Sequence, residues 1–135
     1  MDRTLVIIKP DAVERGLSGE IVARLERKGL HLVAAQLRTI DADTAASHYA
    51  EHVGRPYYAA LVDFITRGPS LVLVVAGVPE VWHVVRTLMG STNPLEAAPG
   101  TIRGDFGLIT RENLVHGSDS PEAAAREIAL FFPTL

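Results

Sequence analysis

Residues Leu71 to Ala76 form an uninterrupted run of apolar side chains, half of them valine. Such a run is typical of a strand covered on both faces, because a strand with one wet face alternates polar and apolar residues. A second short apolar segment, Arg3 to Lys9, is closed by Pro10 and predicts another buried strand. The fold must therefore supply helices that cover a central sheet.

Amphipathic segments with helical start and stop signals separate these strands. Ser, Asp and Pro favour the first positions of helices, and Gly favours the position just after the last turn. On this basis we expect helices from an N-cap at Ser18 to Gly29, from Asp41 to about His52, from Pro56 to Gly68, from Pro79 to Gly90, and from Ser120-Pro121 through Ile128, Phe131 and Phe132. Two further strands are expected at Leu32–Ile40 and Leu114–His116.

The predicted order is β, α, β, two helices, β, α, a long irregular segment, β, α. Two β-α-β units in tandem predict an α/β (α+β) fold of the ferredoxin-like split β-α-β type, with a four-stranded antiparallel sheet covered by helices. We expect residues 1–135 to form one domain. Residues 91–113 carry several prolines and glycines without a sustained period, which favours a binding loop over a plain surface excursion.

Composition excludes several classes of protein. Hydrophobic residues make up 47% and charged residues 21% of the 135 residues, which is ordinary globular composition. The sequence has no cysteine, so disulfides and thiolate metal sites are excluded. Its apolar runs are far shorter than a membrane span, and a net charge of -3 does not favour nucleic-acid binding. We expect a cytoplasmic protein that uses neither membrane nor specific nucleic acid.

The densest polar cluster lies at Asn113 to Ser120 and contains His116. His116 follows apolar residues at a strand end, and we expect Gly117 to turn the backbone and expose the ring. A neutral imidazole is a competent nucleophile toward phosphorus, and Glu127 on the following helix is a candidate to orient it. A histidine hydrogen-bonded at a helix start without any chemistry explains this cluster equally well.

The two commonest phosphate-binding loops are missing from the sequence. Neither G-x-x-x-x-G-K-[ST] nor G-x-G-x-x-G occurs, so side chains and a metal ion would have to hold any nucleotide phosphates. Lys9, Arg86 and Arg103 stand at or near the ends of predicted elements. Each alone is more typical of a solvated surface charge than of a phosphate ligand.

One motif points to different chemistry. His48-Tyr-Ala-Glu51-His52 matches H-x-x-E-H, a zinc peptidase pattern. The predicted helix is short, and nothing in the sequence marks the third protein ligand that a catalytic zinc ion needs. We therefore treat a peptidase as a minor alternative.

Longer strings carry a family resemblance. Pro99-Gly-Thr-Ile-Arg-Gly-Asp-Phe106 and His116-Gly-Ser-Asp-Ser120 are unusual sequences, and they occur in order with Thr4 to Asp11, Arg55-Pro-Tyr57 and Thr92-Asn-Pro94. In these stretches the chain resembles the nucleoside diphosphate kinases of the bacterial type, with a short segment after Phe132. The resemblance extends from near the first residue to near the last.

The resemblance implies an enzyme that moves the terminal phosphate of a nucleoside triphosphate to a nucleoside diphosphate by a ping-pong reaction through His116. By position, Tyr49, Ser118 and Glu127 match residues that position the histidine. The positions that match the family's nucleotide ligands are Lys9, Tyr57, Leu61, Arg86, Thr92, Arg103, Thr110 and Asn113. Mg²⁺ is the implied cofactor, held by the nucleotide phosphates and by no protein ligand directly.

The chain departs from the family pattern at several positions. Tyr57 stands where phenylalanine is usual, Thr110 where a small apolar residue is frequent, and Glu112 where arginine is common. The resemblance also implies a homo-oligomer, with a hexamer expected and a tetramer as the alternative. A catalytically silent nucleotide-binding module of the same fold is the second functional hypothesis.

Overall fold

The computed structural model describes residues 2–135 and contains the expected sheet. Its strands are β1 (Arg3–Ile8), β2 (His31–Arg38), β3 (Ser70–Ala76) and β4 (Val115–Gly117). They lie in the order β2-β3-β1-β4, and every neighbouring pair is antiparallel. The predicted ferredoxin-like fold is therefore confirmed.

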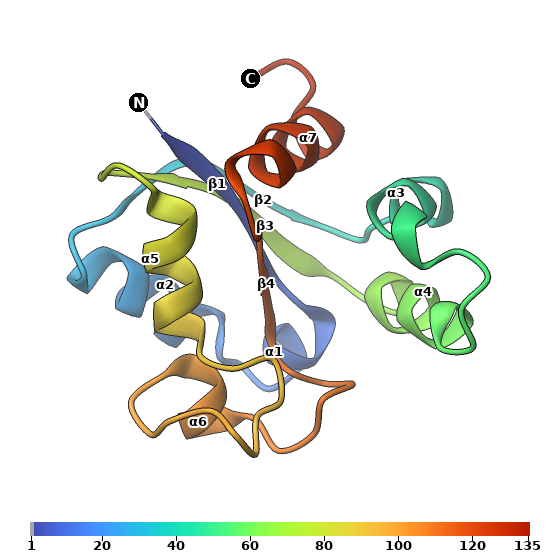
Figure 1. Ribbon diagram of the computed structural model, residues 1–135, viewed down its shortest axis with the longest axis horizontal. Helices are drawn as coiled ribbons and strands as arrows, with labels where there is room; N and C mark the ends of the chain where they lie inside the picture. The colour runs from blue at the N-terminus through green and yellow to red at the C-terminus, as the bar shows by residue number, and fades with distance from the viewer. Residues whose placement is uncertain (1) are drawn as a thin grey trace.

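Helices cover both faces of this sheet (Figure 1). They are α1 (Pro10–Glu14), α2 (Ser18–Arg27), α3 (Ala42–His48), α4 (Tyr58–Thr66), α5 (Val81–Met89), α6 (Ile102–Phe106) and α7 (Pro121–Phe131), with a 3-10 turn η1 (Ala50–His52) after α3. None of the helices in residues 2–135 is long and apolar enough to cross a membrane.

Two hydrophobic cores lie on opposite faces of the sheet, and β1 contributes side chains to both. Val6 and Ile8 pack with residues of α2 and α5 on one face. Leu5 and Ile7 pack with residues of α3, α4 and α7 on the other. Because successive side chains of a strand point to opposite faces, a strand buried on both sides reads as one apolar run. This geometry explains the continuous apolar sequences of β1 and β3.

Several predicted helix starts were misplaced by one or two residues. Ser18 is the first residue of α2, and Leu17 stands at the N-cap without a side-chain cap. Pro56 lies in a turn closed by the Tyr58 N–H to Arg55 carbonyl bond, so α4 begins at Tyr58. The capping predictions for Asp41 and Ser120 are confirmed, since their side chains accept hydrogen bonds from the backbone N–H groups of residues 44 and 123.

Two more boundaries differ from the sequence prediction. Pro79 does not open α5, because Glu80 adopts φ 52° and the helix starts only at Val81. The second strand starts at His31 and ends at Arg38, before the predicted Ile40, whose side chain turns into the core.

The segment from Ser91 to Asn113 is less irregular than the sequence predicts. It contains the one-turn helix α6, whose N-cap Thr101 accepts a hydrogen bond from the Gly104 N–H. A side chain at Gly104 would overlap the carbonyl oxygen of Ala98, so only glycine lets these backbones approach. A five-residue helix has too few turns to produce a hydrophobic period, which explains why the pattern missed it.

The start of β4 is strained and held in place. Leu114, predicted to lie in the strand, has φ 75°, a conformation unusual for a side chain of this size. Its N–H donates to Oδ2 of buried Asp11, and its carbonyl accepts from the Lys9 N–H. The predicted turn at Gly117 is wrong, because Gly117 belongs to β4, and a Cβ there would lie 3.0 Å from Sδ of Met89.

Candidate active site

A polar cavity of about 220 Å³ opens where β1 ends beside β4. Segments far apart in the chain meet here, including α3, α5 and α7. Most of the residues predicted for the site line it together, namely Lys9, Tyr49, Arg86, Thr92, Arg103, Asn113, His116 and Glu127. The structure therefore gathers in one place residues that the sequence spreads over more than a hundred positions.

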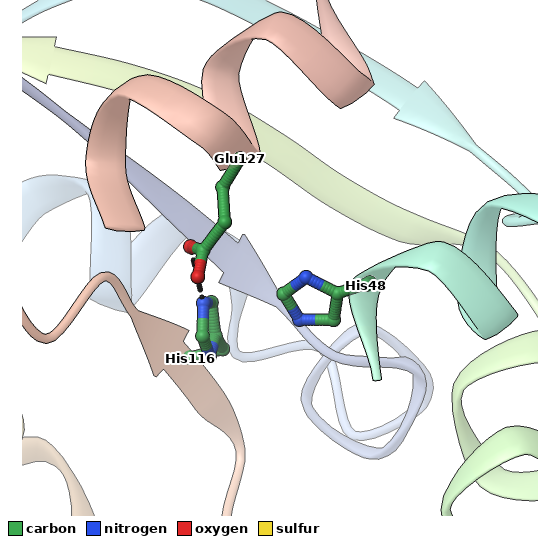
Figure 2. A group of neighbouring side chains, drawn as sticks. All are labelled: His48, His116 and Glu127. Atoms are coloured by element: carbon green, nitrogen blue, oxygen red, sulfur yellow. Dashed lines mark hydrogen bonds and ion pairs between the residues drawn. The ribbon is translucent and has the colours of Figure 1, made fainter. Parts of the chain in front are cut away.

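His116 and Glu127 both line this cavity and are joined by a hydrogen bond (Figure 2). The Nε2 atom of His116 lies 2.8 Å from Oε1 of Glu127, and the Ser118 hydroxyl donates to the same oxygen at 2.8 Å. Burial acts to raise the pKa of Glu127, but the hydrogen bonds and charge of His116, with the Ser118 bond, hold it below its ordinary value. The carboxylate is thus ionised at neutral pH, while the His116 side chain keeps 23% of its surface exposed.

Lys9 and Asn113 form a connected pair on the cavity wall. The Lys9 ammonium donates to Oδ1 of Asn113 at 3.0 Å, and the Asn113 amide donates to the carbonyl of Thr92 at 3.1 Å. Burial, followed by the charge of Arg103, lowers the pKa of Lys9 to about 8. Because the pKa of Lys9 is close to neutral pH, binding of an anionic ligand would change the fraction of Lys9 that is protonated.

Arg103 is engaged with the backbone on three sides. Its guanidinium donates to the carbonyls of Asn113, Gly90 and Val115 at 3.1, 2.8 and 2.7 Å. The side chain is nearly fully buried, and burial followed by the charge of Arg86 lowers its pKa to about 10. A guanidinium has five N–H donors, so two remain for a ligand. Arg86 donates to the Gly117 carbonyl at 2.8 Å.

Tyr49 is buried in the wall of the same cavity, and burial raises the pKa of its hydroxyl to about 12. Its neighbour His48, which was not predicted as a site residue, reaches the same cavity. The His48 and His116 rings meet edge to face, with centroids 4.7 Å apart. Burial lowers the pKa of His48 to about 3, so the ring is neutral at pH 7.

The residues predicted to hold a base lie outside this polar cavity. Tyr57 and Leu61 line a separate, more apolar hollow of about 360 Å³ between α4 and residues 111–112. A hydrogen bond of 2.8 Å between the Tyr57 hydroxyl and Nδ1 of His52 links the two hollows, because His52 lines the polar one. Thr110 is exposed and outside the lining of both.

Sequence reasoning missed other residues of the polar cavity. Asp119 and Arg126 line it, and the Arg126 guanidinium lies 3.7 Å from both Glu127 and Glu51. Asp119 lies within the polar cluster around His116, so its position in the sequence could have identified it as a site residue. Nothing in the sequence distinguishes Arg126, because it is one of several charged residues on an amphipathic helix.

The geometry argues against the zinc peptidase. Within residues 2–135, the group of side chains spaced as metal ligands joins His48 to His116 and Glu127, rather than to Glu51 and His52. Nδ1 of His52 is instead bonded to Tyr57. The H-x-x-E-H motif therefore does not act as one chelating unit.

Comparison with known proteins agrees with this geometry. The family model described as "Nucleoside diphosphate kinase" matches residues 2–135. Proteins named nucleoside diphosphate kinase from Rhodococcus jostii and Frankia casuarinae are 61% and 56% identical over 135 residues, covering 99% and 100% of this chain and 96% and 98% of theirs.

Solved structures agree as well. The nucleoside diphosphate kinase of Halobacterium salinarum in complex with CDP superposes with a TM-score of 0.94 at 50% identity, covering 97% of this chain and 87% of that one. A nucleoside diphosphate kinase family protein from Babesia bovis gives the same TM-score at 49% identity, covering 98% and 88%. On both sequence and structure, the chain belongs to the nucleoside diphosphate kinase family, as its motifs predict.

Proposed function

We propose that this enzyme transfers the terminal phosphoryl group of a nucleoside triphosphate to a nucleoside diphosphate through a phosphohistidine at His116. The observation that carries this proposal is the 2.8 Å bond between His116 Nε2 and Glu127 in a cavity whose lining includes the cations Lys9, Arg86, Arg103 and Arg126. The cations suit a phosphate chain, and the histidine is the nucleophile placed among them. Residues 1–135 then form a single catalytic domain.

The hydrogen bonds define which nitrogen reacts. An ionised carboxylate only accepts hydrogen bonds, so Nε2 of His116 carries the proton and Nδ1 keeps its lone pair. In the first step Nδ1 forms a bond to the terminal phosphorus while the bond to the bridging oxygen breaks, and the diphosphate leaves with that electron pair. Glu127 stabilises the positive charge on the ring. In the second step a terminal oxygen of the acceptor attacks phosphorus, and the P–N electrons return to Nδ1.

The cavity wall supplies the phosphate contacts of the proposed reaction. Lys9, Arg86 and the free donors of Arg103 provide charge-assisted hydrogen bonds to phosphate oxygens. Thr92 and Asn113 provide polar contacts to the phosphates and sugar. These groups are held in place before a nucleotide arrives, which favours stabilisation of the charge on the transferring group.

Mg²⁺ fits this cavity as an ion carried by the nucleotide. The lining presents cationic donors around Lys9 and Arg86, whereas Mg²⁺ prefers oxygen ligands and keeps several waters. Phosphate oxygens would therefore hold the ion, with the Asp119 carboxylate at the rim to receive its water ligands. When bound, Mg²⁺ neutralises phosphate charge.

The nucleoside binds by stacking in this proposal. Tyr57 offers its ring face and Leu61 an apolar contact in the second hollow. Thr110 is the residue before Arg111, which lines that hollow, and we keep it as a candidate contact to the base. The hydroxyl that distinguishes Tyr57 from phenylalanine is bonded to His52, which leaves the face of the ring available. The silent binding module is the weaker hypothesis, because it does not require the His116–Glu127–Ser118 arrangement that the chain keeps. We place the enzyme in the cytoplasm, as a homo-oligomer.

The experiment that tests the function is a two-step labelling assay. Wild-type protein incubated with γ-labelled triphosphate should acquire acid-labile, base-stable label, and an unlabelled diphosphate of another base should remove it. His116→Ala should acquire no label while keeping a wild-type circular dichroism spectrum. Exchange at the wild-type rate in this variant would overturn the mechanism, and labelling that no diphosphate reverses would favour a different reaction.

A further inference from the structure

His48 has no part in the proposed transfer, yet its side chain points at the reacting groups. It lies at the end of α3, whereas His116 lies on β4 and Glu127 on α7, and the three side chains converge (Figure 2). One nitrogen from each histidine and one carboxylate oxygen of Glu127 all lie within 4.8 Å of one another. Three separate elements thus bring two imidazoles and a carboxylate to one point.

The His48 ring also has an unmet bonding capacity. Its Nδ1 atom is buried and has no hydrogen-bond partner in residues 2–135. A buried polar atom without a partner costs free energy, which a ligand at this ring would offset. The ring packs edge to face against Phe131 as well as His116, so its position is fixed by its surroundings.

We propose that His48, His116 and Glu127 form a binding site for a transition metal ion of the Zn²⁺ type. Two imidazoles and one carboxylate are a donor set that Zn²⁺ accepts, with a fourth position left for water or a phosphate oxygen. This site differs from the Mg²⁺ of the proposed reaction, because Mg²⁺ selects oxygen ligands and is carried by the nucleotide.

The spacing is close to that of a bound ion. Metal–ligand distances near 2.1 Å in a tetrahedral site place the ligand atoms about 3.3 Å apart. The three ligand atoms lie within 4.8 Å of one another, so they need to approach by at most about 1.5 Å to share one ion. Ser118, which donates to Glu127 at 2.8 Å, orients that carboxylate and supplies the outer hydrogen bond typical of metal ligands.

Occupation of this site blocks the proposed nucleophile. A metal bound to Nδ1 of His116 uses the lone pair that attacks phosphorus, and a metal bound to Nε2 replaces the hydrogen bond to Glu127. In both cases His116 is not phosphorylated until the ion leaves. This consequence rests on the proposed function, whereas metal binding itself does not.

The test is titration of the nucleotide-free, unphosphorylated protein with Zn²⁺ against a chromophoric chelator. We expect one ion per chain, which excess Mg²⁺ does not displace. Loss of an outer-shell partner typically weakens metal binding by about 10–100-fold, so loss of a direct ligand in His48→Ala should cost at least that much. Absence of stoichiometric binding, or equal affinity in the wild type and His48→Ala, overturns the proposal.

Two histidine variants serve as matched controls. His83→Ala removes an exposed histidine of α5 and should bind Zn²⁺ like the wild type. His52→Ala separates this site from a chelate of the H-x-x-E-H motif, and loss of binding in that variant would assign the ion to the helix instead. The ¹⁵N signals of the His48 and His116 rings, followed in the wild type, give a readout that does not depend on whether any variant folds.

Discussion

The hydrogen bond between Nε2 of His116 and Oε1 of Glu127 is the main electrostatic interaction of the His116 ring. Glu127 is buried, and its negative charge is stabilised by His116 and the Ser118 hydroxyl. A buried charge of this kind costs free energy unless it is fully hydrogen-bonded. A buried negative charge on Glu127 beside the His116 imidazole fits a role in orienting that ring and stabilising its positive charge.

Glu127→Gln should slow phosphorylation of His116 by about 10–100-fold, because the amide still accepts the Nε2 hydrogen bond but no longer balances the charge of the ring. Rapid-quench measurement of phosphoenzyme formation checks this. Glu122→Gln, an exposed carboxylate on the same helix, is the control and should react like the wild type. An undiminished rate in Glu127→Gln would remove this residue from the mechanism.

Lys9 should make nucleotide capture sensitive to alkaline pH. Burial and Arg103 lower its pKa to about 8 in the free protein, so the ammonium that attracts phosphate is lost as pH rises through that value. Because kcat/KM reports ionisations of the free enzyme, kcat/KM should fall above pH 8. Lys9→Arg should lose this alkaline limb, since arginine stays charged. Lys28→Met, at an exposed lysine, should retain it, and a limb that persists in Lys9→Arg would assign it to another group.

At the scale of elements, Arg103 connects parts of the chain that share no secondary structure. From α6 it donates to carbonyls at the end of α5 and on both sides of Leu114, where β4 begins. The strained Leu114 backbone is held from the other side by Asp11. These bonds fix the strand that carries His116, so Arg103 supports the site as well as lining its cavity.

Arg103→Ala should therefore lower both activity and stability. Removal of the guanidinium takes one donor from each of three carbonyls, of which that of Asn113 keeps another donor, the Val115 N–H. A buried carbonyl left without a donor costs about 1–3 kcal/mol, and turnover should fall by roughly 10²-fold or more for every base. Thermal unfolding and steady-state kinetics check the two effects. Arg27→Ala, an exposed arginine of α2, should change neither. A variant with unchanged melting temperature would show that the backbone contacts contribute little.

At the scale of the whole molecule, the residues proposed to contact the phosphates and those proposed to contact the base line two different hollows. The polar one carries the charged groups, and the one beside α4 presents Tyr57, Leu61 and Phe64. Stacking on an aromatic face is tolerant of base identity and worth about 1–3 kcal/mol per base. The division predicts an enzyme that is strict about phosphates and permissive about bases.

Tyr57→Ala should raise KM for adenine, guanine, cytosine and thymine diphosphates by similar factors, because each base loses the same stacking face. The measurement is kcat/KM for the four diphosphates in the wild type and the variant. Tyr57→Phe, which loses only the hydroxyl bond to His52, is the matched control and should keep the stacking contribution. A wild-type preference above about a hundredfold for one base would require a side chain that reads the base edge.

The exposed apolar surface of the segment 91–113 supports a homo-oligomer. Leu95, Leu108 and Ile109 are 77%, 73% and 54% exposed, and β2 lies at an edge of the sheet with Leu37 62% exposed. Contiguous exposed apolar side chains are typical of subunit contacts, and Leu108 and Ile109 are adjacent in this segment. We expect a hexamer by light scattering at micromolar concentration, with a tetramer as the alternative. A monomer at that concentration would contradict both and would leave these side chains without a partner.

Local sequence patterns were sufficient to predict the buried strands, the longer helices and the family, but not the short helices α1 and α6. Runs such as Leu71 to Ala76 report burial on two faces directly, and capping residues such as Asp41 and Ser120 act on neighbours three positions away, so both are readable locally. The motif strings identified the family for the same reason, since each is continuous in the chain.

Contacts between residues far apart in the chain could not be predicted from local sequence patterns, and the tertiary structure was needed to identify them. The one-turn helix α6 depends on close contact with Ala98, and the left-handed Leu114 depends on Asp11, which lies 103 positions away. The contact of His48 with His116 likewise arises because α3 packs against α7 and brings its last residue to His116, whereas its local motif points to Glu51 and His52. Short-range interactions depend on residues that are close in sequence, so local patterns predict them. Side chains from distant segments come into contact only when the sheet forms and brings those segments together.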